Sequence, residues 1–142
     1  MEKKKIIIGR SDIADFTELC LYELAIKIDS GAYTSSIHCK NVVEINNVLH
    51  CQFLDETHEQ FIEKKITFNT YKTTVVKSSN GISSKRYSIK TSITIFNKTY
   101  PITLTLNDRD KMRFPVLIGR KFLSGKFIID PKQLNLSYVQ KK

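Results

Sequence analysis

The chain has 142 residues, and its 23 Lys and Arg against 14 Asp and Glu give a formal net charge of +9. Its length and its 41% apolar residues exclude a disordered chain and favour one domain, residues 1–142, with a real core. No apolar run approaches the roughly 18 residues of a membrane helix, and the apolar stretch after the basic N-terminus is too short for a signal peptide. We therefore expect a cytoplasmic domain with no membrane partner, whose positive charge serves either solubility or an anionic partner.

The first half of the sequence predicts short strands with one buried face, because apolar and polar residues alternate. We expect these strands over 4–9, 24–29, 35–39, 42–54 and 60–68. Asn46-Asn47 has the composition of a turn. Ser11-Asp12 indicates a short helical turn over 11–16, since Ser and Asp are frequent helix N-caps.

The second half predicts further strands, over 72–78, 86–96, 99–106, 116–118, 127–130 and 134–139. Ser79-Asn80-Gly81 is typical of a hairpin tip, and Asn97-Lys98 and Asn107-Asp108 are typical of turns. Residues 120–123 could form one helical turn that ends before Gly125. The sequence thus predicts an all-β domain, a closed or nearly closed barrel with one or two short helical turns.

Two common catalytic templates fail on single residues. His58-Glu59 begins the zinc-protease helix signature, but Ile62 stands where the second histidine is needed. Residues 119–126 resemble a phosphate-binding loop, yet the glycine spacing is too long and Phe127 replaces the Ser or Thr that holds magnesium. These patterns argue against both an HExxH zinc protease and a nucleotide-dependent enzyme.

The cysteines leave one alternative open. Cys20, Cys39 and Cys51 are odd in number, so they cannot all form internal disulfides, and buried free thiols are the commoner case. A zinc site built from His38-Cys39 and His50-Cys51 would use suitable ligands, but neighbours on a strand point to opposite faces. We expect no metal and no cofactor, and a packed or hydrogen-bonded His38.

Asp29 raises the main question of the sequence. It ends an alternating apolar strand, where a carboxylate is costly unless it is paired or hydrogen-bonded. Gly31 allows a tight turn, the Ser30 hydroxyl can tie the loop down, and Ala32 leaves room beside the carboxylate. By itself this stretch is most simply an ordinary strand-end turn.

A second segment changes this interpretation. Asp29-Ser30-Gly31-Ala32, together with Leu117-Ile118-Gly119-Arg120, resembles the retroviral-type aspartic proteases. In those proteins the first motif carries the catalytic carboxylate, and the second closes the barrel beneath it. The resemblance implies an acid-protease barrel of six-stranded type with Asp29 as the catalytic residue. It also implies an active-site loop that includes Ser30, Gly31, Ala32 and Thr34.

A closer resemblance covers nearly the whole chain. The order of its motifs is similar to that of the bacterial and archaeal family called ATP-dependent zinc protease, which is often encoded near glutamate ligases. The matching stretches are 28–38, Ser79-Asn80-Gly81 with Arg86, 107–109 with Met112, 115–120, and Asp130-Pro131. The retropepsin-like fold explains these motifs better than either word of that name.

Two departures from the retropepsin pattern matter. Tyr33 and Thr34 occupy the stretch where retropepsins carry a further Asp, so Arg120 needs another partner, for which we expect Asp130 or Asp108. The hairpin over 77–86 contains only one glycine, whereas retropepsin flaps are rich in glycine. Closure over a substrate is therefore expected to differ.

The resemblance implies a homodimer, because one chain carries one such Asp and the aspartic-protease mechanism uses two. Lys85, Arg86, Arg109 and Arg113 are candidates for binding an acidic or glutamate-tailed peptide. Two alternatives remain: a non-catalytic binding module with this fold, and a basic domain that binds nucleic acid, which we consider less favoured.

Overall fold

The computed structural model of the chain describes residues 4–55, 57–61, 65–77, 79–107 and 113–141. Its strands are β1 (Ile6–Ile8), β2 (Ser11–Phe16), β3 (Leu21–Ile28), β4 (Ser35–Ile45), β5 (Val48–Phe53), β6 (Ile66–Phe68), β7 (Lys72–Lys77), β8 (Ser83–Ile95), β9 (Lys98–Asn107), β10 (Val116–Ile118) and β11 (Phe127–Ile129). Its helices are the 3-10 turn η1 (Thr17–Leu19), α1 (Arg120–Leu123) and α2 (Leu136–Lys141). Within those ranges, no helix has the length and apolar character needed to span a membrane.

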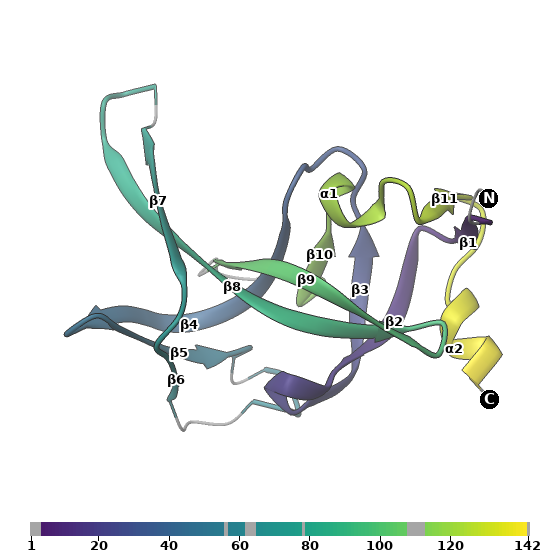
Figure 1. Cartoon of the computed structure of the whole chain (residues 1–142), viewed down its shortest axis with the longest axis horizontal. Helices are drawn as coiled ribbons and strands as arrows, with labels where there is room; N and C mark the ends of the chain where they lie inside the picture. Colours follow the sequence, from purple (N-terminus) through teal and green to yellow (C-terminus); the bar gives the residue numbers. More distant parts are fainter. Residues whose placement is uncertain (1–3, 56, 62–64, 78, 108–112, 142) are drawn as a thin grey trace.

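Six strands close into a barrel (Figure 1). They follow the order β10-β3-β2-β8-β9-β4, and β10 also pairs with β4, so the two ends of the series meet. β10 runs parallel to β3, with Ile118 opposite Ile28, and antiparallel to β4, with Val116 opposite Ile37. The predicted all-β barrel with short helical turns is confirmed.

Alternating side chains fill the inside of the barrel. In β8, Ile89, Ile93 and Ile95 are buried, whereas Lys90 between them is exposed. Period-two burial is what one buried sheet face requires. The same alternation across the barrel strands builds one hydrophobic core, whose fully buried side chains include Phe16, Leu24, Ile26, Ile37, Leu104, Val116 and Ile118.

One hairpin extends away from the barrel. β7 pairs antiparallel with the first half of β8, and Figure 1 shows this pair reaching beyond the other strands. We call residues 72–77 and 79–88 the projecting hairpin. Gly81 at its predicted tip has φ +84°, a conformation that side-chain-bearing residues rarely adopt. The hairpin prediction is therefore confirmed.

Two predicted elements are wrong, because contacts between distant residues decide them: β2 pairs with β3, and Asp12 caps α2. Residues 11–16 form β2 rather than a helical turn, and residues 134–139 are not a strand, because α2 begins at Leu136. The buried Asp12 carboxylate accepts hydrogen bonds from the amides of Ser137 and Tyr138, at 2.9 and 3.2 Å. Asp12 thus satisfies two of the amides that open α2 and, within its own segment, accepts a hydrogen bond from the Ile13 amide at 2.8 Å.

Several other predicted boundaries move. The predicted strand 42–54 is divided at Asn46-Asn47, whose positive φ values suit a tight hairpin between β4 and β5. The turn expected at Asn97-Lys98 lies one position earlier, since Phe96 and Asn97 have positive φ. Among the described residues of the predicted strand 60–68, Ile66–Phe68 form a strand, and residues 62–64 lie outside the described part. Asp108 of the expected turn at 107–108 also lies outside it.

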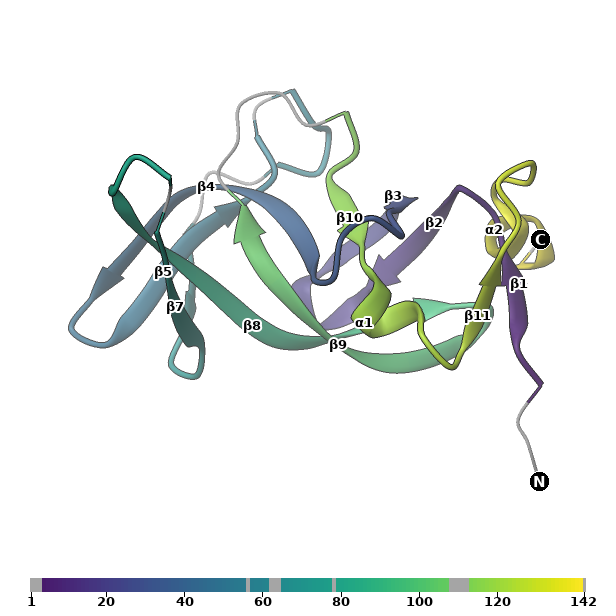
Figure 2. The same cartoon turned by 90° about the horizontal axis from the view of Figure 1, so that it is seen from above.

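Strands near the beginning and the end of the chain pair on one side of the barrel. β1 pairs in parallel with β11, Ile7 opposite Ile128, and both views place these strands beside each other, near α2 (Figures 1 and 2). A Cβ atom on Gly9 would lie 2.3 Å from the carbonyl oxygen of Gln133, so only glycine fits there. The amide of Arg10 donates to that same carbonyl at 2.9 Å.

Candidate functional site

Asp29 is the first residue after β3, beside the end of β10. Its amide donates a hydrogen bond to the carbonyl of Ile118 at 2.8 Å, and its own carbonyl accepts one from Ala32 at 3.1 Å. The first bond extends the parallel pairing of β3 and β10 by one step, and the second closes a turn over residues 29–32. The half-buried carboxylate is therefore carried by a backbone held on both sides.

Gly31 leaves space beside the carboxylate. An added Cβ there would lie 3.4 Å from Asp29 Oδ1. The tight turn expected here is present over residues 29–32, but Gly31 has no positive φ, so the turn does not by itself require a glycine. The glycine at position 31 is better explained by the access that it leaves to the Asp29 carboxylate.

Gly119 lets the segment after β10 pass against the Asp29 loop. An added Cβ on Gly119 would lie 2.5 Å from the carbonyl oxygen of Thr34 and 2.7 Å from that of Tyr33. Its amide donates to the buried Ser35 Oγ at 3.0 Å. Two stretches far apart in the sequence are thus locked together, with Leu117 and Ile118 in the strand that precedes the contact.

Arg120 ties the same two segments together from the outside. Its amide donates to the carbonyl of Ala32 at 2.8 Å, and its Nη1 donates to the carbonyl of Ser30 at 2.9 Å. Its guanidinium carbon lies 5.9 Å from the centre of the Tyr33 ring. Among the described residues, no carboxylate pairs with Arg120, so the expected ion pair with Asp130 is wrong. Asp108, the other expected partner, lies outside the described residues.

This arrangement explains the missing retropepsin carboxylate. An ion pair inside the loop is replaced by hydrogen bonds to backbone carbonyls and by a cation–π contact with Tyr33, which occupies the stretch of the absent Asp. Sequence reasoning missed the roles of Tyr33 and Ser35. The sequence did contain a signal for the role of Tyr33: an aromatic residue stands where a carboxylate is expected, while the positively charged Arg120 is still present.

The described candidate substrate-binding cations lie on two separate segments of the chain. Lys85 and Arg86 are exposed on β8 in the projecting hairpin, and Arg113 is exposed before β10. Lys85 pairs with Val75 and Arg86 with Thr74, so the two neighbours point to opposite faces of the hairpin. Arg109 lies outside the described residues.

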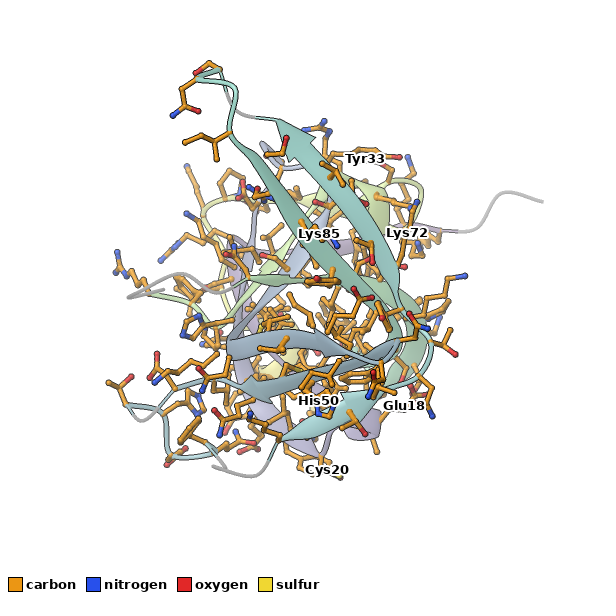
Figure 3. The ribbon with its side chains drawn as sticks, turned by 90° about the vertical axis from the view of Figure 1, so that its left-hand side faces the viewer. Glu18, Cys20, Tyr33, His50, Lys72 and Lys85 are labelled. Carbon is orange, nitrogen blue, oxygen red and sulfur yellow. The ribbon has the colours of Figure 1, made fainter. Side chains whose placement is uncertain are left out.

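The zinc alternative finds no support in the geometry. Within the residues that the structure describes, no group of three or more His, Cys, Asp and Glu side chains could hold a metal ion. Cys39 pairs with Phe53 in the sheet, whereas His50 pairs with Val43. None of the three cysteines forms a disulfide, and burial raises the pKa of Cys51 to about 12. Figure 3 shows Cys20 and His50 at the end of the molecule opposite the hairpin tip.

His38 pairs with a carboxylate instead. Its Nε2 lies 2.9 Å from Asp55 Oδ2, and the side chain is buried, as expected for a hydrogen-bonded histidine. The amide and hydroxyl of Thr57 donate to Asp55 Oδ1. These two bonds, followed by the His38 contact, hold the pKa of Asp55 below its usual value. The pair fastens the segment after β5 to β4.

Comparisons with known proteins agree with this geometry. The family model described as RimB-like, retropepsin-like aspartic endopeptidase RimB, matches residues 8–142. A crystal structure of a Legionella pneumophila protein of unknown function superimposes with a TM-score of 0.67 and 24% identity, over 94% of this chain and 99% of that one. At that identity the likeness supports the fold.

Curated relatives are longer proteins. The chain is 34% identical over 137 residues to a protein of Shewanella pealeana (strain ATCC 700345 / ANG-SQ1), and 33% identical over 143 residues to one of Desulfotalea psychrophila (strain LSv54 / DSM 12343). Both are named probable alpha-L-glutamate ligase. The matches cover 94% and 97% of this chain but only 30% and 31% of those proteins. From the family match and the closure of the barrel around the Asp29 loop, we conclude that the chain belongs to the RimB-like family of retropepsin-like aspartic endopeptidases.

Proposed function

We propose that this chain is one protomer of a homodimeric aspartic peptidase that hydrolyses acidic peptides. The observation that carries the proposal is the placement of Asp29. A half-buried carboxylate follows directly on a strand of the closed barrel, with its backbone bonded to Ile118 and its loop locked by Gly119 and Arg120. A backbone held by such contacts fixes the position of a reacting group before the substrate binds.

The chemistry requires two copies of Asp29. A twofold axis beside the loop would bring two carboxylates together, and because close carboxylates cannot both be charged, the pair holds one proton. The ionised member accepts a proton from a water whose oxygen attacks the peptide carbonyl carbon, while the protonated member donates to the carbonyl oxygen. When the C–N bond breaks, the leaving amine takes a proton and the pair returns to its single-proton state.

The acidic substrate is supported by charge and by the relatives. With a net charge of +9 the chain attracts anionic partners at long range. The curated relatives that contain a similar domain are named glutamate ligases, so a peptide substrate with glutamate residues is chemically consistent with both observations. We therefore propose glutamate-tailed peptides as the substrate class.

Cleavage of a glutamate-rich peptide by the purified chain tests the activity. Wild-type protein should release fragments detectable by mass spectrometry, and Asp29→Asn should abolish their release. Glu59→Gln removes an exposed carboxylate elsewhere and should leave the rate unchanged. Activity that survives in Asp29→Asn would exclude the proposed mechanism. Peptide binding without cleavage by wild-type protein would favour a non-catalytic binding module.

Mixing the two proteins tests the shared site. If each active site needs one Asp29 from each protomer, a random equal mixture of wild type and Asp29→Asn contains active dimers as only about a quarter of the total. Activity per wild-type chain should then fall by about half once subunits exchange. A constant activity per wild-type chain would show that each protomer works alone.

A further inference from the structure

A basic groove lies on the outer face of the barrel, beside the Asp29 loop. A cavity of about 840 Å³ opens between the projecting hairpin, β9 and α1. Figure 2 shows α1 beside β9, and Phe122 of α1 packs edge-on against Tyr100 of β9 at 5.7 Å. We call this cavity the lysine groove, because Lys72, Lys90, Lys121 and Lys126 line it.

Strand register explains why Lys72 and Lys90 share one face of the sheet, whereas Lys121 and Lys126 come from α1 and the segment that follows it. Lys72 pairs with Ser88, and Ser88 pairs with Thr105 on its other side. Lys90 pairs with Thr103 in the next row. Directly paired residues point to the same side of a sheet, so lysines and hydroxyls from β7, β8 and β9 form a continuous polar surface. The opposite face of β8 and β9 is the hydrophobic core.

The lysines of the groove are not paired with carboxylates. Among the described residues, no Asp or Glu lines the groove, and none pairs with Lys72, Lys90 or Lys121, whose side chains are exposed. The nearby carboxylates of Glu18 and Glu44 accept hydrogen bonds from lining hydroxyls, those of Thr91 and Tyr71. Lys126 is half-buried, and its Nζ donates to the carbonyl of Phe122 at 2.9 Å. The same Nζ lies 5.0 Å from the centre of the Phe122 ring, and the hydrogen bond to the carbonyl uses one of the three donors of the ammonium group.

The lysine groove is joined to the Asp29 loop by covalent and hydrogen-bonded links. Thr34 and Ser35, which end that loop, also line the groove. The amide of Lys121 donates to the carbonyl of Tyr33 at 2.9 Å, so the position of this lysine is fixed relative to the loop. At the other end, Arg86 pairs with Thr74 and therefore lies on the groove face of the projecting hairpin. Lys72 and Lys85, on the two strands of this hairpin, are labelled in Figure 3.

We infer that the lysine groove binds an acidic stretch of the substrate that lies outside the residues held at the scissile bond. This inference rests on the proposed peptidase function and adds a second, separate contact region to it. Carboxylates of an extended peptide would pair with the ammonium groups, and the Ser and Thr hydroxyls would bond its remaining carbonyls and amides. Longer acidic peptides should then bind more tightly than short ones.

A peptide fits the groove better than a nucleic acid does. Binding of single strands depends strongly on bases stacked on aromatic faces. The aromatic residues of the groove are not available for this. Tyr71 is half-buried, packs edge-on against Tyr87 and donates to Glu44, and Phe122 is buried. The proximity of Thr34 and Lys121 to the catalytic loop further favours a polypeptide that continues toward Asp29.

The test compares charge reversal inside and outside the groove. In the Asp29→Asn background, the double variant Lys72→Glu/Lys90→Glu is compared with Lys98→Glu/Lys132→Glu, which changes the charge equally at exposed positions that do not line the groove. Binding of short and long oligoglutamate peptides is measured by fluorescence anisotropy. Oligoglutamine peptides of equal length serve as neutral ligands.

The groove variant should lose at least about tenfold in affinity for the long oligoglutamate. Its affinity for the short peptide should stay close to that of the control variant. Equal losses in both double variants would overturn the inference, as would an affinity for oligoglutamate that does not rise with length. Tighter binding of single-stranded nucleic acid than of long oligoglutamate, lost in the groove variant, would reassign the groove.

Kinetic measurements on the protein with Asp29 intact distinguish a failure of the groove inference from a failure of the proposed function. With Asp29 intact, the groove variant should show a reduced kcat/KM for long acidic peptides and an unchanged value for short ones. If no peptide is cleaved by any Asp29-containing protein, the proposed function fails, while the anisotropy comparison still decides the groove. If cleavage occurs with no dependence on Lys72 or Lys90, only the groove inference fails.

Discussion

Ser35 Oγ accepts a hydrogen bond from the amide of Gly119 at 3.0 Å, and both residues are buried. The bond joins the end of the Asp29 loop to the turn between β10 and α1. Because a buried amide without a partner is costly, this one contact makes the loop and the turn depend on each other.

Ser35→Ala should leave the Gly119 amide unsatisfied and lower the free energy of unfolding by about 1–3 kcal/mol. Urea unfolding followed by circular dichroism measures this change. Ser36→Ala, at a half-buried neighbouring position, is the matched control and should cost less. Equal effects of the two substitutions would show that the hydrogen bond to Gly119 contributes little.

Gly119→Ala should be more damaging, because the new Cβ would meet the Thr34 carbonyl oxygen at 2.5 Å. Overpacking of this kind typically costs about 1–3 kcal/mol, and here backbone must move to relieve it. Gly31→Ala has its nearest contact at 3.4 Å and should keep near-normal stability. If Gly119→Ala unfolds at the wild-type urea concentration, the close approach of the two segments is wrong.

The resemblance and the alternation predicted much of this architecture, and the errors have physical causes. Val116–Ile118 and Arg120–Leu123 were placed correctly because a short apolar strand, a glycine and a short helical turn follow each other locally. The helix within 134–139 depends on a contact between Asp12 and Ser137, and the strand over 11–16 depends on pairing with β3; no local pattern shows either. Tertiary contacts therefore decide both elements.

The candidate site, like the fold, was predictable from the sequence only in part. The resemblance singled out Asp29 and Gly119, and the structure brings their segments together. The partner of Arg120 could not be found by looking for a carboxylate, since backbone carbonyls and a ring take that place. The lysine groove depends on cross-strand register, which sets which lysines share a face.

Arg120→Lys tests the contacts that replace the ion pair. A lysine keeps the charge but lacks the planar guanidinium that bonds the Ser30 carbonyl while it lies over Tyr33. We expect a folded protein with lower kcat and little change in KM, because the loop that carries Asp29 becomes less ordered. Lys121→Arg, on the next residue, should leave kcat unchanged. A large rise in KM with normal kcat in Arg120→Lys would contradict a role in ordering the loop.

Asp12→Ala should release α2. The substitution removes the acceptor for two amides of this helix and is expected to cost about 1–2 kcal/mol, the usual effect of losing a cap. Hydrogen exchange at Ser137 and Tyr138 should accelerate more than exchange in β8 and β9. Asp130→Ala, at a half-buried position outside this contact, is the control. Uniform acceleration across the chain would indicate general destabilisation instead.

Asp55→Asn should produce a pH-dependent loss of stability. The pKa of Asp55 is lowered in the folded protein, so its contribution is present above the unfolded pKa and is lost as pH falls through the folded value. At neutral pH we expect a loss of about 1 kcal/mol from weakened bonds to Thr57 and His38. The difference from wild type should shrink in acid, below about pH 4. A difference that grows as the pH falls would reverse the assigned sign.

The closure of the barrel by β10, and of its side by β11 and α2, has a consequence for synthesis on the ribosome. The strand that bonds to the Asp29 amide is Val116–Ile118, and the helix that Asp12 caps begins only at Leu136. A nascent chain from which Asp29 has already emerged therefore still lacks the strand that bonds to the Asp29 loop and the helix that packs against the first strands. The Asp29 loop would be locked only after the segment 116–120 has left the exit tunnel, so incomplete chains would carry Asp29 without the contacts that hold it in place.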